Sequence, residues 1–286
     1  MFLRSAIVGL ILFFSLTNMK SQTQNSLLWE ISGNGLSQPS YIYGTIHQIA
    51  KSDFVVRKEI DSVFDLCKQV AFEIKLDDTT LLSTYRNWIY LPEGKTLRDY
   101  CTEEEYSILK NYLSDHGQTD IESIKYQKPF VLAQMQTSDY VTGETASYEL
   151  YFFDRLTQNN IPLFGLETMQ NELDVFDSMP YDHQIDMVLG AIDSTRNMQV
   201  LWTDLITAYK KEDLDALYGI LLVASPELMA YENLFISGRN ANWIPVVENL
   251  IMENTTFIAV GAAHLPGAKG ILQLLENKGY SLKPIY

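Results

Sequence analysis

The sequence contains few cysteines and histidines and lacks several familiar catalytic motifs. It has two Cys and four His among 286 residues. No Cys-x-x-Cys, His-Glu-x-x-His, Gly-x-Ser-x-Gly or Gly-x-Gly-x-x-Gly segment is present. These absences disfavour zinc fingers, common zinc peptidases, serine hydrolases and dinucleotide enzymes. Cys67 and Cys101 can form a disulfide in an exported protein or remain two buried thiols, and both alternatives stay open.

Positive charge is also scarce. The chain has 21 Lys and Arg against 36 Asp and Glu, a formal net charge of −15. Such a chain, with no basic stripe, repels phosphate backbones, so nucleic-acid binding is disfavoured. Gly94-Lys95-Thr96 resembles the end of a phosphate-binding loop, but Ile89 stands where that loop requires Gly. We therefore predict no nucleotide site there.

Long apolar runs are absent except near the N-terminus. Residues 6–16 follow Arg4 and form an apolar run of about eleven residues, too short to cross a bilayer but typical of a secretory signal. We predict a signal peptide over residues 1–21, with a retained membrane anchor as the alternative. The protein would then be periplasmic or extracellular, without stable membrane insertion after the signal is removed. Residues 22–286, about 265 in number, suit a single α/β domain.

Short strand-like segments alternate with longer helical ones along the rest of the chain. Apolar and β-branched residues predict strands at 27–31, 40–43, 70–76, 161–164, 256–260 and 280–286. Helical spacing of apolar residues predicts a helix over 54–66, and we predict that 79–158 and 169–253 are mostly helical. We predict a mixed α/β fold: a central, mostly parallel sheet with helices on both faces and a large helical insertion in the middle of the chain.

Two of the four histidines belong to the same tetrapeptide pattern. Gly44-Thr45-Ile46-His47 and Gly261-Ala262-Ala263-His264 each follow a predicted strand. We interpret the glycines as positions that permit a tight or left-handed backbone step. Each His is thereby delivered at the carboxyl end of a strand, where open α/β sheets bind ligands. The functional interpretation is one site at which both imidazoles meet as metal ligands or acid–base groups. The alternative is two separate structural histidines.

Three charged residues are further candidates for this site. Glu73 interrupts an apolar strand, where an unpaired carboxylate is costly, so it either faces a cation or lies on a solvated edge. Glu167 follows the strand predicted at 161–164 and is close to a Gly. The planar fork of Arg239 can bind a substrate carboxylate or a developing oxyanion, or form a surface salt bridge.

Other polar residues are assigned structural roles. Glu172 is predicted to be a solvated helix residue. His116 is predicted at a helix exit and His183 at a helix start, positions where histidine is common without catalysis.

These motifs together resemble the TraB/GumN family, which is related to the Tiki proteases. The resemblance covers most of the mature chain. The segments that carry it are, in chain order, Leu28-Trp29, Gly33-Asn34-Gly35, 39–47, Phe72-Glu73-Ile74, 91–97, Gly165-Leu166-Glu167-Thr168, Arg239-Asn240-x-x-Trp243, 260–267 and Gly279-Tyr280. One departure is Gln48-Ile49-Ala50, where relatives often carry a small apolar residue and Gly.

The resemblance implies a mixed α/β fold that is shared more distantly with erythromycin esterases and a haem-binding lipoprotein. It also implies metal-dependent peptidase activity of the Tiki kind. The paired motifs then correspond to His47 and His264, and the strand motif to Glu73. Glu167 and Arg239 fall on recurring positions of the family.

Our leading hypothesis is an exported metal-dependent hydrolase, most simply a peptidase. His47, Glu73 and His264 would hold Mn²⁺, Co²⁺ or Zn²⁺ and leave a position for water. Glu167 would act as general base, and Arg239 would stabilise the oxyanion or anchor a substrate carboxylate. The substrate would be a peptide or a small molecule, and the oligomeric state is left open. One alternative is a metal-independent esterase-type hydrolase that uses His47 and Glu73, and another is a non-enzymatic haem- or iron-binding protein.

Overall fold

The structure is a computed structural model that describes residues 25–116, 120–141, 143–193 and 197–286. The predicted signal peptide over residues 1–21 lies outside the described residues. Across these four ranges, none of the helices is long and apolar enough to cross a membrane.

The centre of the molecule is a six-stranded sheet with the order β6-β4-β7-β2-β1-β8. The four strands β6, β4, β7 and β2 run parallel, β1 is antiparallel to β2, and β8 is antiparallel to β1. The prediction of a mixed, mostly parallel sheet is confirmed. The strands are β1 Leu28–Gly33, β2 Ser40–Thr45, β4 Gln69–Ile74, β6 Leu163–Glu167, β7 Thr256–Gly261 and β8 Tyr280–Pro284.

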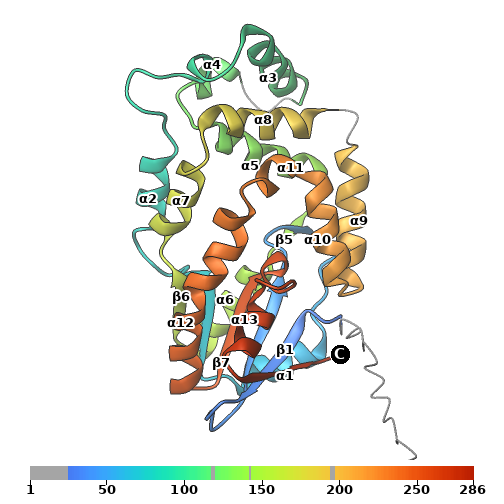
Figure 1. The fold of residues 1–286 in the computed structure, drawn as a ribbon. Helices are drawn as coiled ribbons and strands as arrows, with labels where there is room; N and C mark the ends of the chain where they lie inside the picture. The colour runs from blue at the N-terminus through green and yellow to red at the C-terminus, as the bar shows by residue number, and fades with distance from the viewer. Residues whose placement is uncertain (1–24, 117–119, 142, 194–196) are drawn as a thin grey trace, which may run out of the picture.

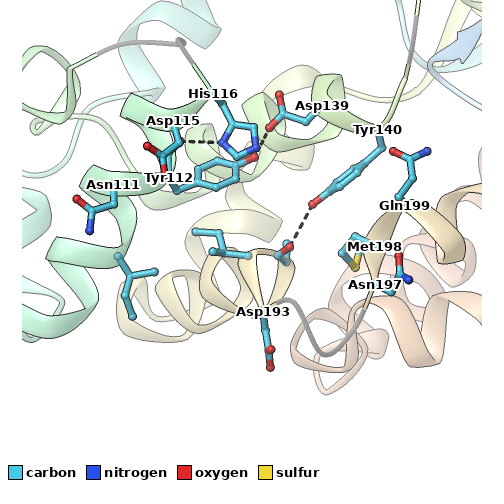
Figure 2. A pocket seen from close by; sticks show the side chains of 13 residues that line it. Asn111, Tyr112, Asp115, His116, Asp139, Tyr140, Asp193, Asn197, Met198 and Gln199 are labelled. Carbon is cyan, nitrogen blue, oxygen red and sulfur yellow. Dashed lines mark hydrogen bonds between the residues drawn. The ribbon is translucent and has the colours of Figure 1, made fainter.

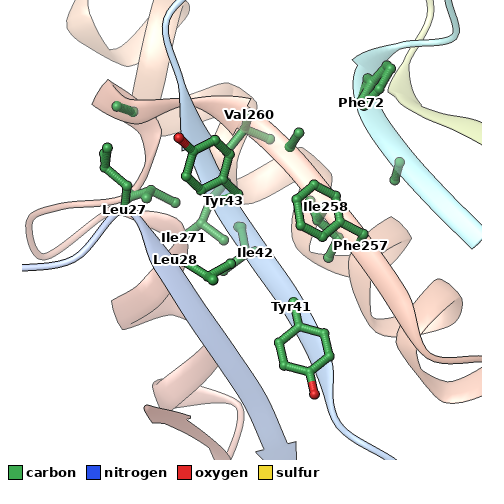
Figure 3. Packing of buried hydrophobic residues seen from close by; sticks show 14 of the residues in the cluster. Leu27, Leu28, Tyr41, Ile42, Tyr43, Phe72, Phe257, Ile258, Val260 and Ile271 are labelled. Carbon is green, nitrogen blue, oxygen red and sulfur yellow. The ribbon is translucent and has the colours of Figure 1, made fainter. Parts of the chain in front are cut away.

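Helices cover both faces of the sheet (Figure 1). On one face lie α1, Lys58–Leu66, and α6, Tyr148–Asn159, whose Phe64 and Phe152 rings lie 5.2 and 4.8 Å from Phe257 of β7. On the other face lie α12, Gly238–Glu253, and α13, Ile271–Asn277. Figure 3 shows Ile271 beside the strand residue Ile42. Burial on both faces explains why the central strands β4 and β7 consist mostly of apolar residues.

The remaining helices extend beyond the carboxyl edge of the sheet and correspond to the predicted insertion (Figure 1). The helices that contain Leu109, Leu132 and Val188 enclose a second hydrophobic core, whereas Ile206 and Leu217 belong to the core around the sheet. The remaining helices are α2 Leu81–Trp88, α3 Glu103–Asp115, α4 Ile121–Ile124, α5 Pro129–Tyr140, α7 Met169–Asp177, α8 Tyr181–Ile192, α9 Met198–Lys210, α10 Leu214–Ala224 and α11 Pro226–Met229.

Three local features differ from expectation or resolve an open alternative. The strand predicted at 161–164 is β6, Leu163–Glu167, so Glu167 ends the strand instead of following it. A two-stranded pair of β3, Ile49–Ala50, and β5, Thr145–Ala146, was not predicted because two-residue strands carry no periodic pattern. Cys67 and Cys101 are free thiols that lie against different hydrophobic cores.

Candidate metal centre

Three residues predicted as metal ligands meet at the carboxyl edge of the sheet. His47 follows β2, Glu73 is the penultimate residue of β4, and His264 lies in the single turn η4, Ala262–His264, that follows β7. Because β4, β7 and β2 are adjacent parallel strands, their carboxyl ends share one edge. The topology therefore brings together two histidines from opposite ends of the chain.

Both imidazoles are directed at the same carboxylate oxygen. The Nε2 atom of His47 lies 3.9 Å from Oε1 of Glu73, and the Nε2 atom of His264 lies 4.0 Å from that same oxygen. These separations exceed hydrogen-bond length. Both nitrogen atoms therefore lie near Oε1 of Glu73 without forming a hydrogen bond to it.

The glycines of the two motifs are required for space, which corrects the expectation that they permit a left-handed step. Neither Gly44 nor Gly261 has a positive φ. A Cβ at Gly44 would lie 2.8 Å from Cδ1 of Leu265 and 3.1 Å from Cα of Ala262, so the first motif packs directly against the second. A Cβ at Gly261 would lie 3.3 Å from Oε1 of Glu73. The Gly261 N–H also donates to that oxygen at 2.7 Å.

Glu149 orients the first histidine. Its Oε1 accepts a hydrogen bond from the hydroxyl of Thr45 at 2.6 Å and lies 3.0 Å from Nδ1 of His47. Its Oε2 accepts from the hydroxyl of Ser147 at 2.8 Å. Because the pKa of Glu149 is lowered, by hydrogen bonds and by the charge of His47 against the effect of burial, its ionised oxygen can only accept. Nδ1 of His47 therefore carries the proton, and a neutral His47 presents a lone pair at Nε2.

Asn240 plays the same part for the second histidine. Its amide nitrogen donates to the backbone carbonyls of His264 and Lys269 at 3.2 and 2.9 Å, which leaves Oδ1 as the acceptor 2.7 Å from Nδ1 of His264. Nδ1 of His264 thus also carries the proton, and its Nε2 faces Glu73 as a lone-pair donor. The neutral form of each histidine would therefore be the tautomer that a metal ligand requires.

The charge states of the three residues follow from their surroundings. Burial would raise the pKa of Glu73, but the charges of His264, Arg239 and His47 and the Gly261 N–H lower it to about 2. Burial lowers the pKa of His264 to about 4, against the opposing charge of Glu73. Desolvation would lower the pKa of His47 too, but the hydrogen bond to Glu149 and the charge of Glu73 raise it to about 9. His47 is also far more exposed, with 68% of its side chain accessible against 7% for His264.

Arg239 joins two of the predicted site residues. Its Nη2 donates to Oε2 of Glu73 at 2.7 Å, and its Nε donates to Oε1 of Glu167 at 2.8 Å, which Nη2 also contacts. Its Nη1 donates to the carbonyl of Phe235 at 3.4 Å, within the π-helical turn Asn233–Ser237 that precedes α12. Its guanidinium carbon lies 4.7 Å from the centre of the Trp243 ring. Arg239 is therefore a buried cation held by two carboxylates and a ring.

Glu172 lies at the site, contrary to the prediction of a solvated helix residue. Its Oε1 is 3.8 Å from Nη2 of Arg239, and 25% of its side chain is exposed. Burial raises the pKa of Glu172 to about 7, and the negative charges of Glu73 and Glu167 act in the same direction. The prediction failed because α7 begins directly after β6, so its first turn stays at the carboxyl edge of the sheet.

His47, Glu73 and His264 suit a divalent ion in the type of their donor atoms and in the direction of their side chains. Two imidazoles and one carboxylate form the usual open, three-ligand site for a catalytic metal. Ligand atoms around a tetrahedral ion lie roughly 3.4 Å apart, so the separations of 3.9 and 4.0 Å would have to close by about half an ångström. Accordingly, across the described ranges no group of three or more His, Cys, Asp or Glu side chains already has metal-holding geometry.

The other two histidines lie elsewhere. Nδ1 of His116 donates to the carbonyl of Tyr112 at 2.8 Å, and the ring lines a cavity of about 570 Å³ in the helical insertion (Figure 2). His183 contacts the hydroxyl of Tyr231 through Nδ1. Within the described part of the chain, no hydrogen bond or ion pair links either ring to the metal-ligand candidates. Their non-catalytic role stays a prediction.

Comparison with known proteins places this chain in a family. The profile of the TraB/PrgY/gumN family matches residues 27–284. The chain belongs to the TraB/PrgY/gumN family. Every site residue described above lies inside the matched segment, including Glu149 and Asn240, whose roles as histidine partners the sequence did not reveal.

Two animal proteins are similar to this TraB/PrgY/gumN chain over most of its length. Metalloprotease TIKI1 of Danio rerio is 24% identical over 93% of this chain and 64% of its own length. Metalloprotease TIKI2 of Xenopus tropicalis is 23% identical over 92% of this chain and 61% of its own length. The chain thus spans less than two thirds of these relatives. No solved protein structure matches the chain significantly.

Proposed function

We propose that this TraB/PrgY/gumN protein is an exported metal-dependent hydrolase that acts on peptides in the periplasm or outside the cell. The observation that carries the proposal is the direction of both imidazole Nε2 atoms toward Oε1 of Glu73, with each Nδ1 held by an oxygen. The names of the two metalloprotease relatives support the peptidase assignment.

In this proposal His47, Glu73 and His264 hold one Mn²⁺, Co²⁺ or Zn²⁺ ion. Such an ion, when bound, polarises a carbonyl and lowers the pKa of water. Glu149 and Asn240 keep the two rings in position and in the correct tautomer. Glu73 is held at its second oxygen by Arg239, which fixes the direction of its first.

Arg239 is the proposed catalytic residue at the substrate side, and Glu167 is its ion-pair partner. Among the described residues, Arg239 makes four hydrogen bonds: one to Glu73, one to Phe235 and two to Glu167. A guanidinium has five N–H groups. One N–H of Nη1 is therefore left to donate to the oxyanion or to a substrate carboxylate.

The test is peptide hydrolysis by the purified protein before and after removal of metal. We expect a chelator to abolish hydrolysis and stoichiometric Mn²⁺, Co²⁺ or Zn²⁺ to restore it. Hydrolysis that persists in metal-free protein would contradict the proposal and favour the esterase-type alternative. A haem absorption band without turnover would favour the binding protein.

The affinity for the divalent ion is expected to depend on pH through His47. With a pKa of about 9, His47 is an imidazolium at neutral pH in the metal-free protein, whereas His264, with a pKa of about 4, is already neutral. Binding must displace one proton from His47, so affinity should rise about tenfold per pH unit between pH 6 and 8 and level off above pH 9. Titration calorimetry in buffers of different ionisation enthalpy measures this proton directly. Affinity that does not change over that range would show that His47 is not a ligand.

A further inference from the structure

Four carboxylates near the site differ in the hydrogen bonds that they accept. Glu73, Glu149 and Glu167 each accept at least one hydrogen bond from an N–H or O–H group. For Glu172, the contact among the described residues is Arg239, at 3.8 Å, which is too long for a hydrogen bond. Glu172 is thus a carboxylate at this site whose oxygens remain available.

Glu167 is poorly placed to receive a proton. Its Oε1 accepts from both Nε and Nη2 of Arg239, and this buried ion pair would be broken by protonation. Glu167 instead fixes the orientation of the guanidinium. A proton acceptor must be able to bind water, which the Arg239 pair opposes, and only 9% of the Glu167 side chain is accessible.

The Glu172 side chain is also accessible enough to exchange a proton with water. It lies in the first turn of α7, with 25% of its side chain accessible, whereas the side chain of its neighbour Arg239 is 10% exposed. The Glu172 side chain is therefore more accessible to water than the guanidinium beside it. The charged groups that act on it are Glu73 of β4, Arg239 of α12, Glu167 of β6 and His47 after β2. Burial and the negative charges of Glu73 and Glu167 outweigh the positive charges of Arg239 and His47, so the pKa of Glu172 is raised to about 7. A pKa in this range suits proton exchange at neutral pH.

We infer that Glu172 is the catalytic residue that takes up and returns the proton during hydrolysis, and that Glu167 is a positioning residue for Arg239. This inference rests on the proposed hydrolase function. Glu172 accepts a proton from water as the water oxygen bonds to the scissile carbonyl carbon, and the carbonyl π pair moves to oxygen. When the C–N bond breaks, its electron pair stays on nitrogen and Glu172 returns the proton there. The products are an amine and a carboxylic acid.

The experiment compares Glu172→Gln, Glu167→Gln and the control Asp174→Asn. Asp174 lies on the same helix, is exposed, and bonds to Gln170, so its variant removes one charge without touching the site. We expect Glu172→Gln to lower kcat about a hundredfold or more, with KM nearly unchanged, and to remove the acidic limb near pH 7. Its affinity for Zn²⁺ should equal that of the wild type. Infrared difference spectra of the metal-free protein should lose a carboxyl band that titrates near pH 7.

Three outcomes would overturn the inference. If the wild type hydrolyses peptides and Glu172→Gln keeps its kcat and pH profile, another group accepts the proton. Loss of Zn²⁺ binding in Glu172→Gln would make Glu172 a ligand. If Glu167→Gln alone removed the acidic limb of the pH profile, Glu167 would be the proton acceptor. A wild type that hydrolyses no peptide would instead defeat the proposed function, and this inference with it.

Discussion

Replacing Glu73 with Gln is expected to lower the affinity for a divalent ion by roughly a hundredfold or more and to abolish hydrolysis. The amide keeps the size of the side chain and can still accept from the Gly261 N–H. It removes the negative charge that both imidazoles face and that Arg239 pairs with. Isothermal titration with Zn²⁺ and peptide hydrolysis measure the two effects.

The same substitution is expected to destabilise the fold. Arg239 is buried, and removal of one carboxylate leaves Glu167 as its principal counter-charge. Breaking a buried pair in this way costs about 3 kcal/mol, which urea denaturation can measure. Glu144→Gln serves as the control because Glu144 is exposed and pairs with Lys51 away from the ligands. A Glu73→Gln variant that binds Zn²⁺ as tightly as the control would refute the assignment of Glu73 as a ligand.

Gly261→Ala is expected to impair metal binding with little change in stability. Its φ of −52° and ψ of 134° suit alanine, so the backbone is not strained. The added methyl would lie 3.3 Å from Oε1 of Glu73, 3.6 Å from Cδ2 of His264 and 3.7 Å from Nε2 of His47. The methyl group would occupy space that an ion needs between these donor atoms, so we expect a loss of affinity of about tenfold to hundredfold, roughly 1.4–2.7 kcal/mol.

Two other glycines provide controls for that experiment. Gly219 lies on α10 with nothing within 4 Å of an added Cβ, so Gly219→Ala should leave affinity unchanged and slightly stabilise the helix. Gly44→Ala should destabilise the fold, because its Cβ would meet Leu265 and Ala262. If Gly261→Ala bound Zn²⁺ like Gly219→Ala, the space between the three donors would not be the metal position.

The sequence predicted the parts of the site that strand direction controls. His47, Glu73 and His264 come at or just after the ends of strands, and parallel strands bring such ends to one edge. The glycine spacing was recognised, but its cause was misjudged. Local sequence cannot distinguish a glycine needed for its φ angle from one needed because another loop packs against it.

The residues that support the ligands could not be predicted because they depend on tertiary contacts. Glu149 reaches His47 because β3, just after His47, pairs with β5, just before Glu149. Two paired residues per strand leave no pattern in the sequence. The role of Asn240 likewise depends on the packing of α12 against the His264 turn. Glu172 was misread because helical periodicity does not show which end of a helix faces a sheet edge.

X-ray absorption at the zinc edge of the protein loaded with Zn²⁺ tests the central claim most directly. We expect one ion per chain whose ligands include two imidazole nitrogens, together with carboxylate and water oxygens. His47→Ala and His264→Ala should each remove one imidazole from the spectrum. An ion whose imidazole signal survives both substitutions, or a chain that binds no stoichiometric zinc, would contradict a shared site at the carboxyl edge of the sheet.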